Sequence, residues 1–246
     1  LADEVDKQTK ELKEKQKKLE LLTETLYLLK QANTINESIH HIVQSLNQLG
    51  AQYCVVTLLS NDLHSLYIAE IYPKNFKNFL SKISQNNIIN NKLDFNQYAN
   101  LPFFSVIKSS EELVLEELEK IENLIITTFP RIDIKTKELF LSYIKNKIVV
   151  IYPIGTKHKI EGSIAIAIDK QLNEENKDFI QLLLNAAAVE INRKRNQEEL
   201  IKSELKYRNL VENTQDMIIL CTENGNIVYG NSAFNKFLGT TETLKH

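Results

Sequence analysis

One stretch of about 40 residues, Asn173 to Asn213, contains neither Gly nor Pro and consists mostly of good helix formers. It predicts a single helix of roughly 60 Å, longer than one globular domain requires. Its first half, DFIQLLLNAAAVEI, is apolar enough to be half buried against a folded domain. The second half has only sparse apolar positions, which are Leu200, Ile201, Leu205, Leu210 and Val211. We therefore expect this helix to close one domain and to lead into another.

The composition restricts the class of protein. A length of 246 residues with 43% hydrophobic side chains is enough for one large or two small domains with an apolar core. The 30 basic and 32 acidic side chains nearly cancel, so the overall charge does not favour nucleic acid or an anionic membrane as a partner. Cys54 and Cys221 are far apart, which favours a reducing compartment over a disulfide framework or a zinc cluster.

No apolar run approaches the roughly 18 residues that a membrane span needs, and the sequence shows no signal peptide. We expect a cytoplasmic location, with the alternative that the parent protein is tethered to a membrane. The chain begins with Leu and stops in what looks like the middle of a domain, so we expect it to be part of a longer protein.

The first 47 residues or so are predicted to be helical, with a coiled-coil linker over residues 1–29. Apolar residues recur every seven positions at Val5, Leu12, Leu19 and Leu26. The intervening heptad positions hold Gln8 and Lys15 at first and Leu22 and Leu29 later. This pattern is typical of a parallel coiled-coil dimer whose seam strengthens from Leu19 onward. The alternative is a solvated amphipathic helix that packs on its own domain.

The middle of the chain alternates strands and helices. Residues 51–60 and 63–73 are rich in β-branched and aromatic residues and flank the turn signal Asn61-Asp62, which predicts an antiparallel hairpin. A second antiparallel pair is predicted over residues 147–155 and 161–169, joined by a polar turn that includes His158. Between these pairs we expect helices over 76–84, 102–110, 118–125 and 136–146, a short strand over 113–117, and an Asn-rich loop over 85–100.

The two faces of the last predicted strand differ in side-chain size. Ile160, Gly162, Ile164, Ile166 and Ile168 alternate with Ser163, Ala165 and Ala167. We expect the small-residue face to receive the long helix through Ala186, Ala187 and Ala188, and the isoleucine face to point to the other side of the sheet. The result is a three-layer α+β fold, with an antiparallel sheet covered by helices on both faces.

This order of elements resembles the GAF domain. The segments that carry the resemblance are IKSSEELVLEELE, similar to the family's helix-to-strand passage ahead of its ligand pocket, and NKIVVIYPIGTKHKIEGSIAIAID, similar to its closing hairpin. The resemblance covers roughly residues 30–192 and implies a GAF-like sensor domain there.

A second segment, YRNLVENTQDMIILCTENGNIVYGNSAFNKFLG, is very similar to the opening of PAS domains that follow signalling helices in sensor kinases. It implies a signalling helix over 193–210 and the N-terminal part of a PAS domain over 211–246. Two strands around Glu223-Asn224-Gly225-Asn226 suit a tight hairpin, and Asn231 or Ser232 is suited to cap the next helix. Because two strands and one helix cannot bury a stable core, we expect this end to be loosely packed.

The sequence lacks the motifs of enzymes that bind nucleotides or use a nucleophile, so we expect no catalytic residue in this chain. His40-His41 lacks the context of a phosphoacceptor and is interpreted as a surface or subunit-interface pair. Among the ligands of GAF relatives, cyclic nucleotides are disfavoured because Asn91-Lys92 is not followed by Phe-x-x-x-Asp-Glu. Bilins are disfavoured because neither cysteine has a neighbouring His. A haem ligated by Cys54 competes with the simpler interpretation of a small buried hydrophobe. No cofactor is identified and no metal site is predicted.

The candidate pocket-lining residues are Tyr53, Cys54, Tyr72, Phe104, Phe129 and Tyr152, with Phe103 as a further aromatic. The alternative is that they are core residues and that the pocket is empty.

These patterns together predict the sensory and relay region of a two-component sensor histidine kinase. We expect a homodimer formed through the N-terminal and C-terminal helices, a small-molecule ligand in the GAF-like domain, and no nucleic-acid partner. A response regulator would be contacted only by kinase domains that this chain lacks, which would carry out the phosphorelay. The alternatives are a dimerisation and relay module without a ligand, or a sensor with another output, such as a cyclic-dinucleotide enzyme or a transcription activator.

Overall fold

Two units make up the chain, Leu1–Asn192 and Arg193–His246. The computed structural model describes residues 2–60, 64–83, 92–94, 101–129, 132–156, 159–169 and 174–239. The turn predicted at Asn61-Asp62, the turn residue His158 and the last residues of the PAS-like segment lie outside these ranges. The first residue of the predicted long helix, Asn173, also lies outside them.

The first unit alternates helices and strands in the predicted order. Its helices are α1 (Ala2–Gln31), α2 (Ile35–Gln48), α3 (Lys74–Ile83), α5 (Pro102–Ser109), α6 (Leu118–Thr128) and α7 (Ile134–Ile144). Its strands are β1 (Tyr53–Leu59), β2 (Ser65–Tyr72), β3 (Lys92–Asp94), β4 (Leu113–Leu115), β5 (Lys147–Thr156) and β6 (Lys159–Asp169). Helix α8 (Glu174–Asn213) follows as 40 continuous residues, so the long uninterrupted helix is confirmed.

The six strands form one antiparallel sheet in the order β3-β2-β1-β6-β5-β4. Strand β3 corrects the prediction of a loop over residues 85–100, because Lys92–Asp94 pairs with the start of β2. The rest of that stretch lies outside the described residues. Strand β6 is central and pairs with β1 on one side and β5 on the other.

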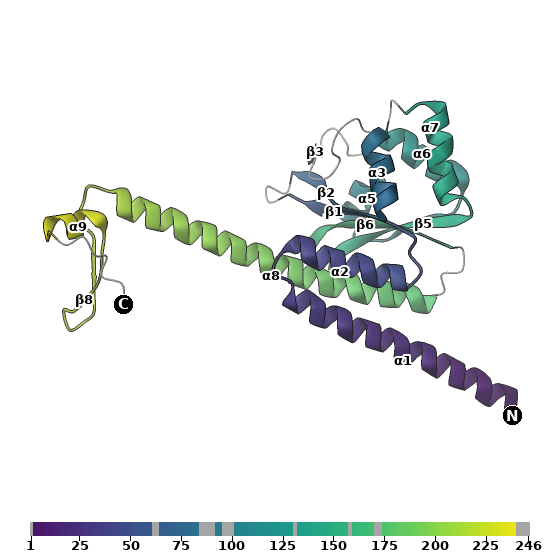
Figure 1. The fold of residues 1–246 in the computed structure, drawn as a ribbon, viewed down its shortest axis with the longest axis horizontal. Coiled ribbons are helices and arrows are strands. Elements are labelled where there is room, and N and C mark those ends of the chain that lie inside the picture. The colour runs from purple at the N-terminus through teal and green to yellow at the C-terminus, as the bar shows by residue number, and fades with distance from the viewer. Residues whose placement is uncertain are drawn as a thin grey trace. The chain divides into compact units, whose positions relative to one another are not determined.

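Helices cover both faces of the sheet, which confirms the three-layer α+β architecture. Helix α2 and the first half of α8 lie on one face, and α3, α6 and α7 lie on the other (Figure 1). Helix α5 adds Val106 to the second of these layers. The two helical layers therefore contact the same strands from opposite sides.

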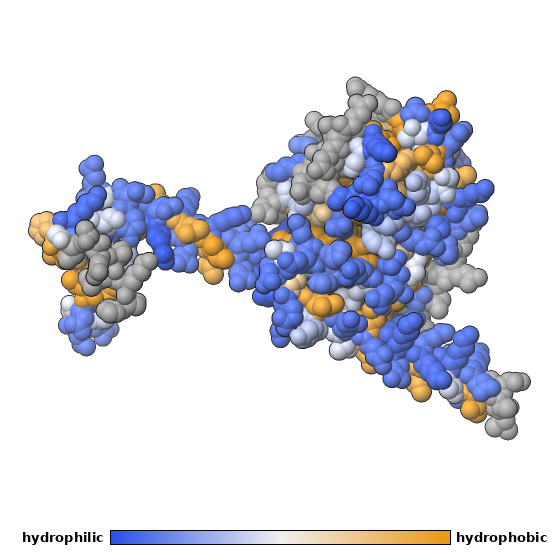
Figure 2. Space-filling view, in the orientation of Figure 1, coloured by the Kyte–Doolittle hydropathy of each residue, from blue (hydrophilic) through white to orange (hydrophobic). Residues whose placement is uncertain are grey.

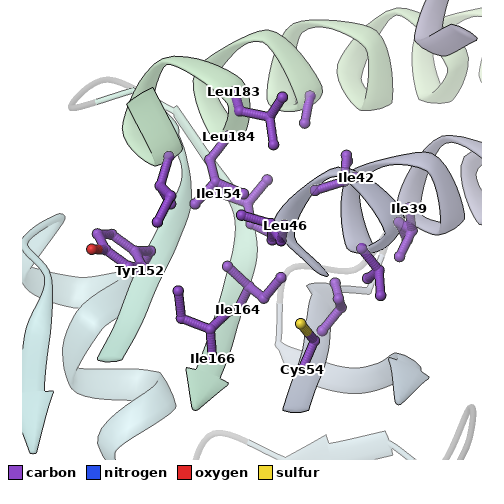
Figure 3. Close-up of a cluster of buried hydrophobic side chains, with 14 of the residues drawn as sticks. Ile39, Ile42, Leu46, Cys54, Tyr152, Ile154, Ile164, Ile166, Leu183 and Leu184 are labelled. Carbon is purple, nitrogen blue, oxygen red and sulfur yellow. The ribbon is translucent and has the colours of Figure 1, made fainter. Parts of the chain in front are cut away.

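The expected assignment of the two faces of β6 is wrong. Ile164 and Ile166, not the alanines, face α8, where they pack with Leu183 and Leu184 and with side chains of α2 (Figure 3). Ala187 and Ala188 do lie in this layer, but against the isoleucine face. The reason is packing volume, because the space between the sheet and two helices must be filled by large side chains to reach the density of a protein interior.

The helical structure predicted for the first 47 residues or so is confirmed, and it is divided into two helices by a break between Gln31 and Ile35. The hydroxyl of Thr34 accepts a hydrogen bond from the backbone N–H of Glu37 (3.1 Å), and the carboxylate of Glu37 accepts one from the N–H of Asn33 (2.7 Å). Both bonds satisfy backbone donors at the start of α2 in the manner of a capping box.

The break lets the end of α1 pack beside α2. Leu29 is fully buried in the core, and the Thr25 hydroxyl lies 2.6 Å from that of Ser45 in α2. The last turns of α1 are therefore part of the folded unit, although residues 1–29 were assigned to a linker.

The second unit contains the end of α8, the hairpin β7 (Ile219–Cys221) and β8 (Ile227–Gly230), and helix α9 (Ser232–Phe237). The turn of the hairpin places Gly225 at φ +81°, a conformation that glycine adopts without strain. Asn231, one of the two predicted caps, accepts a hydrogen bond from the N–H of Phe234 at the start of α9.

Glu212 connects the end of α8 to this hairpin. Its carboxylate accepts hydrogen bonds from the Tyr229 hydroxyl (2.6 Å) and from the hydroxyl and N–H of Ser232 (2.6 and 2.9 Å). These donors lower the pKa of the Glu212 carboxyl, with Ser232 the largest cause. Apolar side chains of β7 are nevertheless exposed, such as Leu220 at 59%. The loose packing expected for this end stays a prediction, which amide exchange measures.

Among the described residues, no helix combines the length and the apolar character that crossing a membrane requires.

Candidate functional site

A cavity of about 110 Å³ lies between the sheet and the helices α3, α6 and α7. The strands contribute Tyr53, Val55, Thr57, Ile68, Val149, Ala165 and Ala167 to its lining. Ile166 also borders it, although its side chain packs in the core on the opposite face. The helices and loops contribute Phe76, Leu80, Leu101, Phe103, Ile121, Leu124, Ile125, Thr128, Phe129, Phe140 and Ile144. The site is therefore on the sheet face opposite α2 and α8.

The small residues of β6 explain why this face is hollow. Ala165 pairs with Val55 of β1 and Ile151 of β5, and Ala167 pairs in the same way with Tyr53 and Val149. Each alanine therefore sits between two larger neighbours on the same face of the sheet. Because a methyl group fills less space than the side chains around it, the central strand leaves a hollow beneath the helices.

Aromatic rings of α3 and α7 meet over one side of this hollow. The ring of Phe76 in α3 lies 4.9 Å from that of Tyr53 and 5.6 Å from that of Phe140 in α7, between centroids. Phe129 lies 6.2 Å from Phe140. These separations are typical of favourable edge-to-face and tilted aromatic pairs. The rings thus hold two helices together above the cavity.

The polar groups at the cavity are few and largely occupied. The Thr57 hydroxyl lies 2.7 Å from the hydroxyl of Ser163 and 3.2 Å from its carbonyl oxygen. The Thr128 hydroxyl donates to the carbonyl of Leu124 at 2.7 Å. Among the described residues, no Asp, Glu, Lys, Arg or His lines the cavity. The site therefore offers shape and apolar surface rather than charge.

The structure brings only part of the sequence-predicted pocket together. Tyr53 and Phe129, and the further candidate Phe103, line the cavity. Cys54 and Tyr152 lie in the core on the opposite face, under α2 and α8 (Figure 3). Tyr72 packs at the margin of that same core, and Phe104 joins a separate small cluster with Leu59, Leu66 and Leu101.

Strand periodicity accounts for this division. Tyr53 and Cys54 are neighbours on β1, so their side chains point to opposite faces of the sheet. The sequence signal for the cavity is the small-residue face of β6. Composition alone does not show that Val55 and Thr57 lie beside this face or that Phe140 of α7 lines the same cavity.

Cys54 is a buried thiol in an apolar layer, as the simpler interpretation expected. Burial raises the pKa of its thiol to about 12, so the thiol is protonated at neutral pH in the folded chain. Its neighbours are the apolar side chains of the α2 and α8 layer. No group of three or more His, Cys, Asp and Glu residues suited to hold a metal occurs within the described ranges.

The neighbouring histidines of α2 serve no visible site. His40 is exposed, and its Nε2 lies 3.0 Å from the side-chain nitrogen of Gln44 on the same helix. His41 is half-buried beside it. This arrangement agrees with the interpretation of a helix-surface pair.

Comparisons with known proteins find similarities for both parts of the chain. Residues 205–245 match the family model of the PAS domain. The GAF domain of a phosphoenolpyruvate-protein phosphotransferase from Coxiella burnetii superposes with a TM-score of 0.52 at 14% identity, covering 74% of this chain and 96% of that one. The GAF domain of the corresponding Acinetobacter protein gives a TM-score of 0.50 at 11% identity, covering 72% and 94%. None of the curated proteins compared with the chain matches it.

These findings confirm the two resemblances. The chain contains a domain with the GAF fold, followed by a segment that matches the PAS family at its C-terminal end. At this level of identity, the structural similarity concerns the fold.

Proposed function

We propose that this chain is the sensory and relay region of a signal-transduction protein, in which the GAF-like unit binds a small molecule in its cavity and transmits the change to its helices. The observation that carries the proposal is that the cavity and the helices α2 and α8 share the same strands. Ala165 and Ala167 face the cavity, while Ile164 and Ile166 face α2 and α8. A ligand that shifts β6 therefore alters the packing of α8.

Such a shift has two discrete outcomes rather than a continuous range, because closely packed layers repack instead of deforming smoothly. A ligand changes their balance only to the extent that it binds one packing better than the other. The cavity favours this sensory role over the alternative of a relay module without a ligand.

The relay requires a partner for the exposed sides of the helices, and we propose a second copy of this chain. In α1 the heptad residues Val5, Leu12 and Leu19 are 56%, 68% and 63% exposed, whereas Leu29 at the alternate heptad position is buried in the core. The C-terminal end of α1 thus packs into the domain, whereas the exposed heptad residues nearer its N-terminus remain available for a parallel coiled coil.

The second half of α8 has the same character, with apolar residues at its surface (Figure 2). They include Leu200 at 69% exposed and Leu205 at 53% exposed. A parallel dimer would cover these residues and would carry the signal along α8 toward the PAS segment.

We further propose that the parent protein is a cytoplasmic or membrane-tethered two-component sensor histidine kinase, and that phosphorelay to a response regulator belongs to its kinase domains. The support is the resemblance of the segment that begins in the last turns of α8 to PAS domains of sensor kinases, together with the family match over 205–245. A cyclic-dinucleotide enzyme or a transcription activator is the alternative output, and the activity of the full-length protein distinguishes them.

Disulfide cross-linking tests the dimer and the relay on the purified chain, with Cys221→Ser as background because Cys221 is exposed. Leu12→Cys, at the predicted seam, should cross-link rapidly on oxidation. Lys17→Cys, on the opposite side of the heptad, is the matched control and should cross-link at least several-fold more slowly. Equal rates, or a monomeric mass at high protein concentration by sedimentation equilibrium, would reject the dimer.

The relay is then measured at Leu200→Cys, with and without the cavity-filling change Ala165→Leu. We expect filling the cavity to change the cross-linking rate at this position by at least about twofold, because it shifts the packing under α8. An unchanged rate in a folded variant would reject the relay while leaving the dimer intact.

A further inference from the structure

We infer that the ligand of the cavity is a neutral, apolar molecule about the size of one aromatic ring, such as a benzene derivative without a charged substituent. This inference rests on the proposed sensory role and names the chemical class that the site accepts. It follows from the charge, the volume and the ring geometry of the lining.

The lining excludes ions. A carboxylate, phosphate or ammonium group would lose its hydration shell and find no opposite charge among the described lining residues. The hydroxyls of Thr57 and Thr128 already have partners within the protein. A charged ligand would therefore bind far more weakly than a neutral molecule of the same shape.

The volume of the cavity limits the size of the ligand, or guest, that it can hold. Engineered apolar cavities of roughly 150 Å³ lined by Leu, Ile and Phe stay dry and bind benzene or xenon. A cavity of about 110 Å³ is of the same order and has the same kind of lining. A nucleotide or a tetrapyrrole is several times larger than such a guest and would require the helices α3, α6 and α7 to move apart.

The aromatic side chains favour a flat ring among apolar guests. Tyr53, Phe76 and Phe140 meet at tilted or nearly perpendicular angles of 58° and 73°. Rings arranged in this way present edges as well as faces, and an aromatic guest gains from edge-to-face contact beyond the burial of its area. Ala165 and Ala167 form the floor, where a flat molecule is not obstructed by longer side chains.

The first experiment compares toluene with its charged analogues benzoate and benzylamine on the purified chain. Toluene at about five times its dissociation constant should raise the melting temperature by about 2–4 °C, and the two ions should leave it unchanged. Xenon, a neutral probe without hydrogen-bonding groups, should give a concentration-dependent ¹²⁹Xe shift.

Variants localise the binding. Ala165→Leu should abolish the response to toluene and xenon, and Ala167→Val is a milder second filler if the first variant does not fold. Leu124→Ala enlarges the cavity at a half-buried position and should shift the preference toward naphthalene. Ile164→Val changes the opposite face of the same strand, and this matched control should keep the response to toluene.

The outcomes separate this inference from the proposed function. Binding of benzoate or benzylamine that Ala165→Leu abolishes, without binding of toluene, would overturn the ligand class and leave a sensory cavity. Failure of every probe to bind would overturn the inference by itself. If toluene binds but leaves the cross-linking rate at Leu200→Cys unchanged, the ligand class stands and the relay fails.

Discussion

The two faces of strand β6 are built from the same backbone but are filled to different degrees. On the isoleucine face, Ile164 and Ile166 are fully buried against side chains of α2 and α8 (Figure 3). On the alanine face, Ala165 and Ala167 leave a hollow beneath α3, α6 and α7. The two faces therefore have different roles. The filled face stabilises the fold and holds α2 and α8 against the sheet, while the hollow face has room for a ligand.

The largest expected difference between the faces comes from removing one leucine from each. Leu184→Ala in α8 should lower the free energy of unfolding by about 2–5 kcal/mol, because Leu184 is fully buried and its removal leaves a new cavity. Leu124→Ala beside the existing cavity should cost clearly less, since its side chain is only half-buried. Urea denaturation measures both values, and equal losses would contradict the comparison.

Enlarging an alanine to leucine should also affect the stability of the two faces differently. Ala187→Leu introduces a larger side chain into the packed layer and should destabilise the protein by about 1–3 kcal/mol. Ala165→Leu places the same group in the cavity and should be neutral or slightly stabilising, because it buries apolar surface in vacant space. A strong destabilisation by Ala165→Leu in the same denaturation experiment would mean that the alanine face is already full.

The smallest expected effect concerns Cys54 on the packed face. Its pKa of about 12 means that the folded protein keeps the thiol protonated, whereas the unfolded chain releases the proton near its ordinary pKa of about 8.5. The resulting contribution to stability is fully present below pH 8.5 and is lost as the pH rises toward 12. Between pH 8 and 9.5 the loss amounts to about 1 kcal/mol.

The variant Cys54→Ala lacks the thiol but keeps the tyrosines and lysines that titrate in the same pH range. Subtracting its free energy of unfolding from that of the unmodified chain at each pH should therefore show the decrease caused by Cys54 alone. A thiol reagent at pH 8 should modify the exposed Cys221 quickly and Cys54 only on unfolding. Rapid modification of both would show that water reaches the face that we describe as packed.

Much of the fold can be predicted from the sequence because it depends on local patterns of residues. The absence of Gly and Pro from 173 to 213 predicted α8, and the alternation of Ile with Ala predicted a two-faced strand in a sheet covered on both sides. The Asn-Gly turn and the cap at Asn231 were predicted from the backbone conformations that these residues favour.

The candidate site is harder to predict from the sequence because it depends on which helices cover each face of the sheet. Tyr53 and Cys54 are adjacent in sequence, yet only the former lines the cavity. The heptad pattern predicted helical structure up to about residue 47 but did not locate the break at Thr34, because apolar spacing carries no information on capping. The capping bonds of Thr34 and Glu37 and the burial of Leu29 instead favour two helices that fold back on each other.

The sequence by itself determined most of the elements, their order and the presence of one large and one small face on β6, because side-chain periodicity is a property of the strand alone. The tertiary structure decided that α2 and α8 cover the large face and that the small face remains hollow. That choice depends on the volumes of side chains from distant segments, which meet only when the chain has folded.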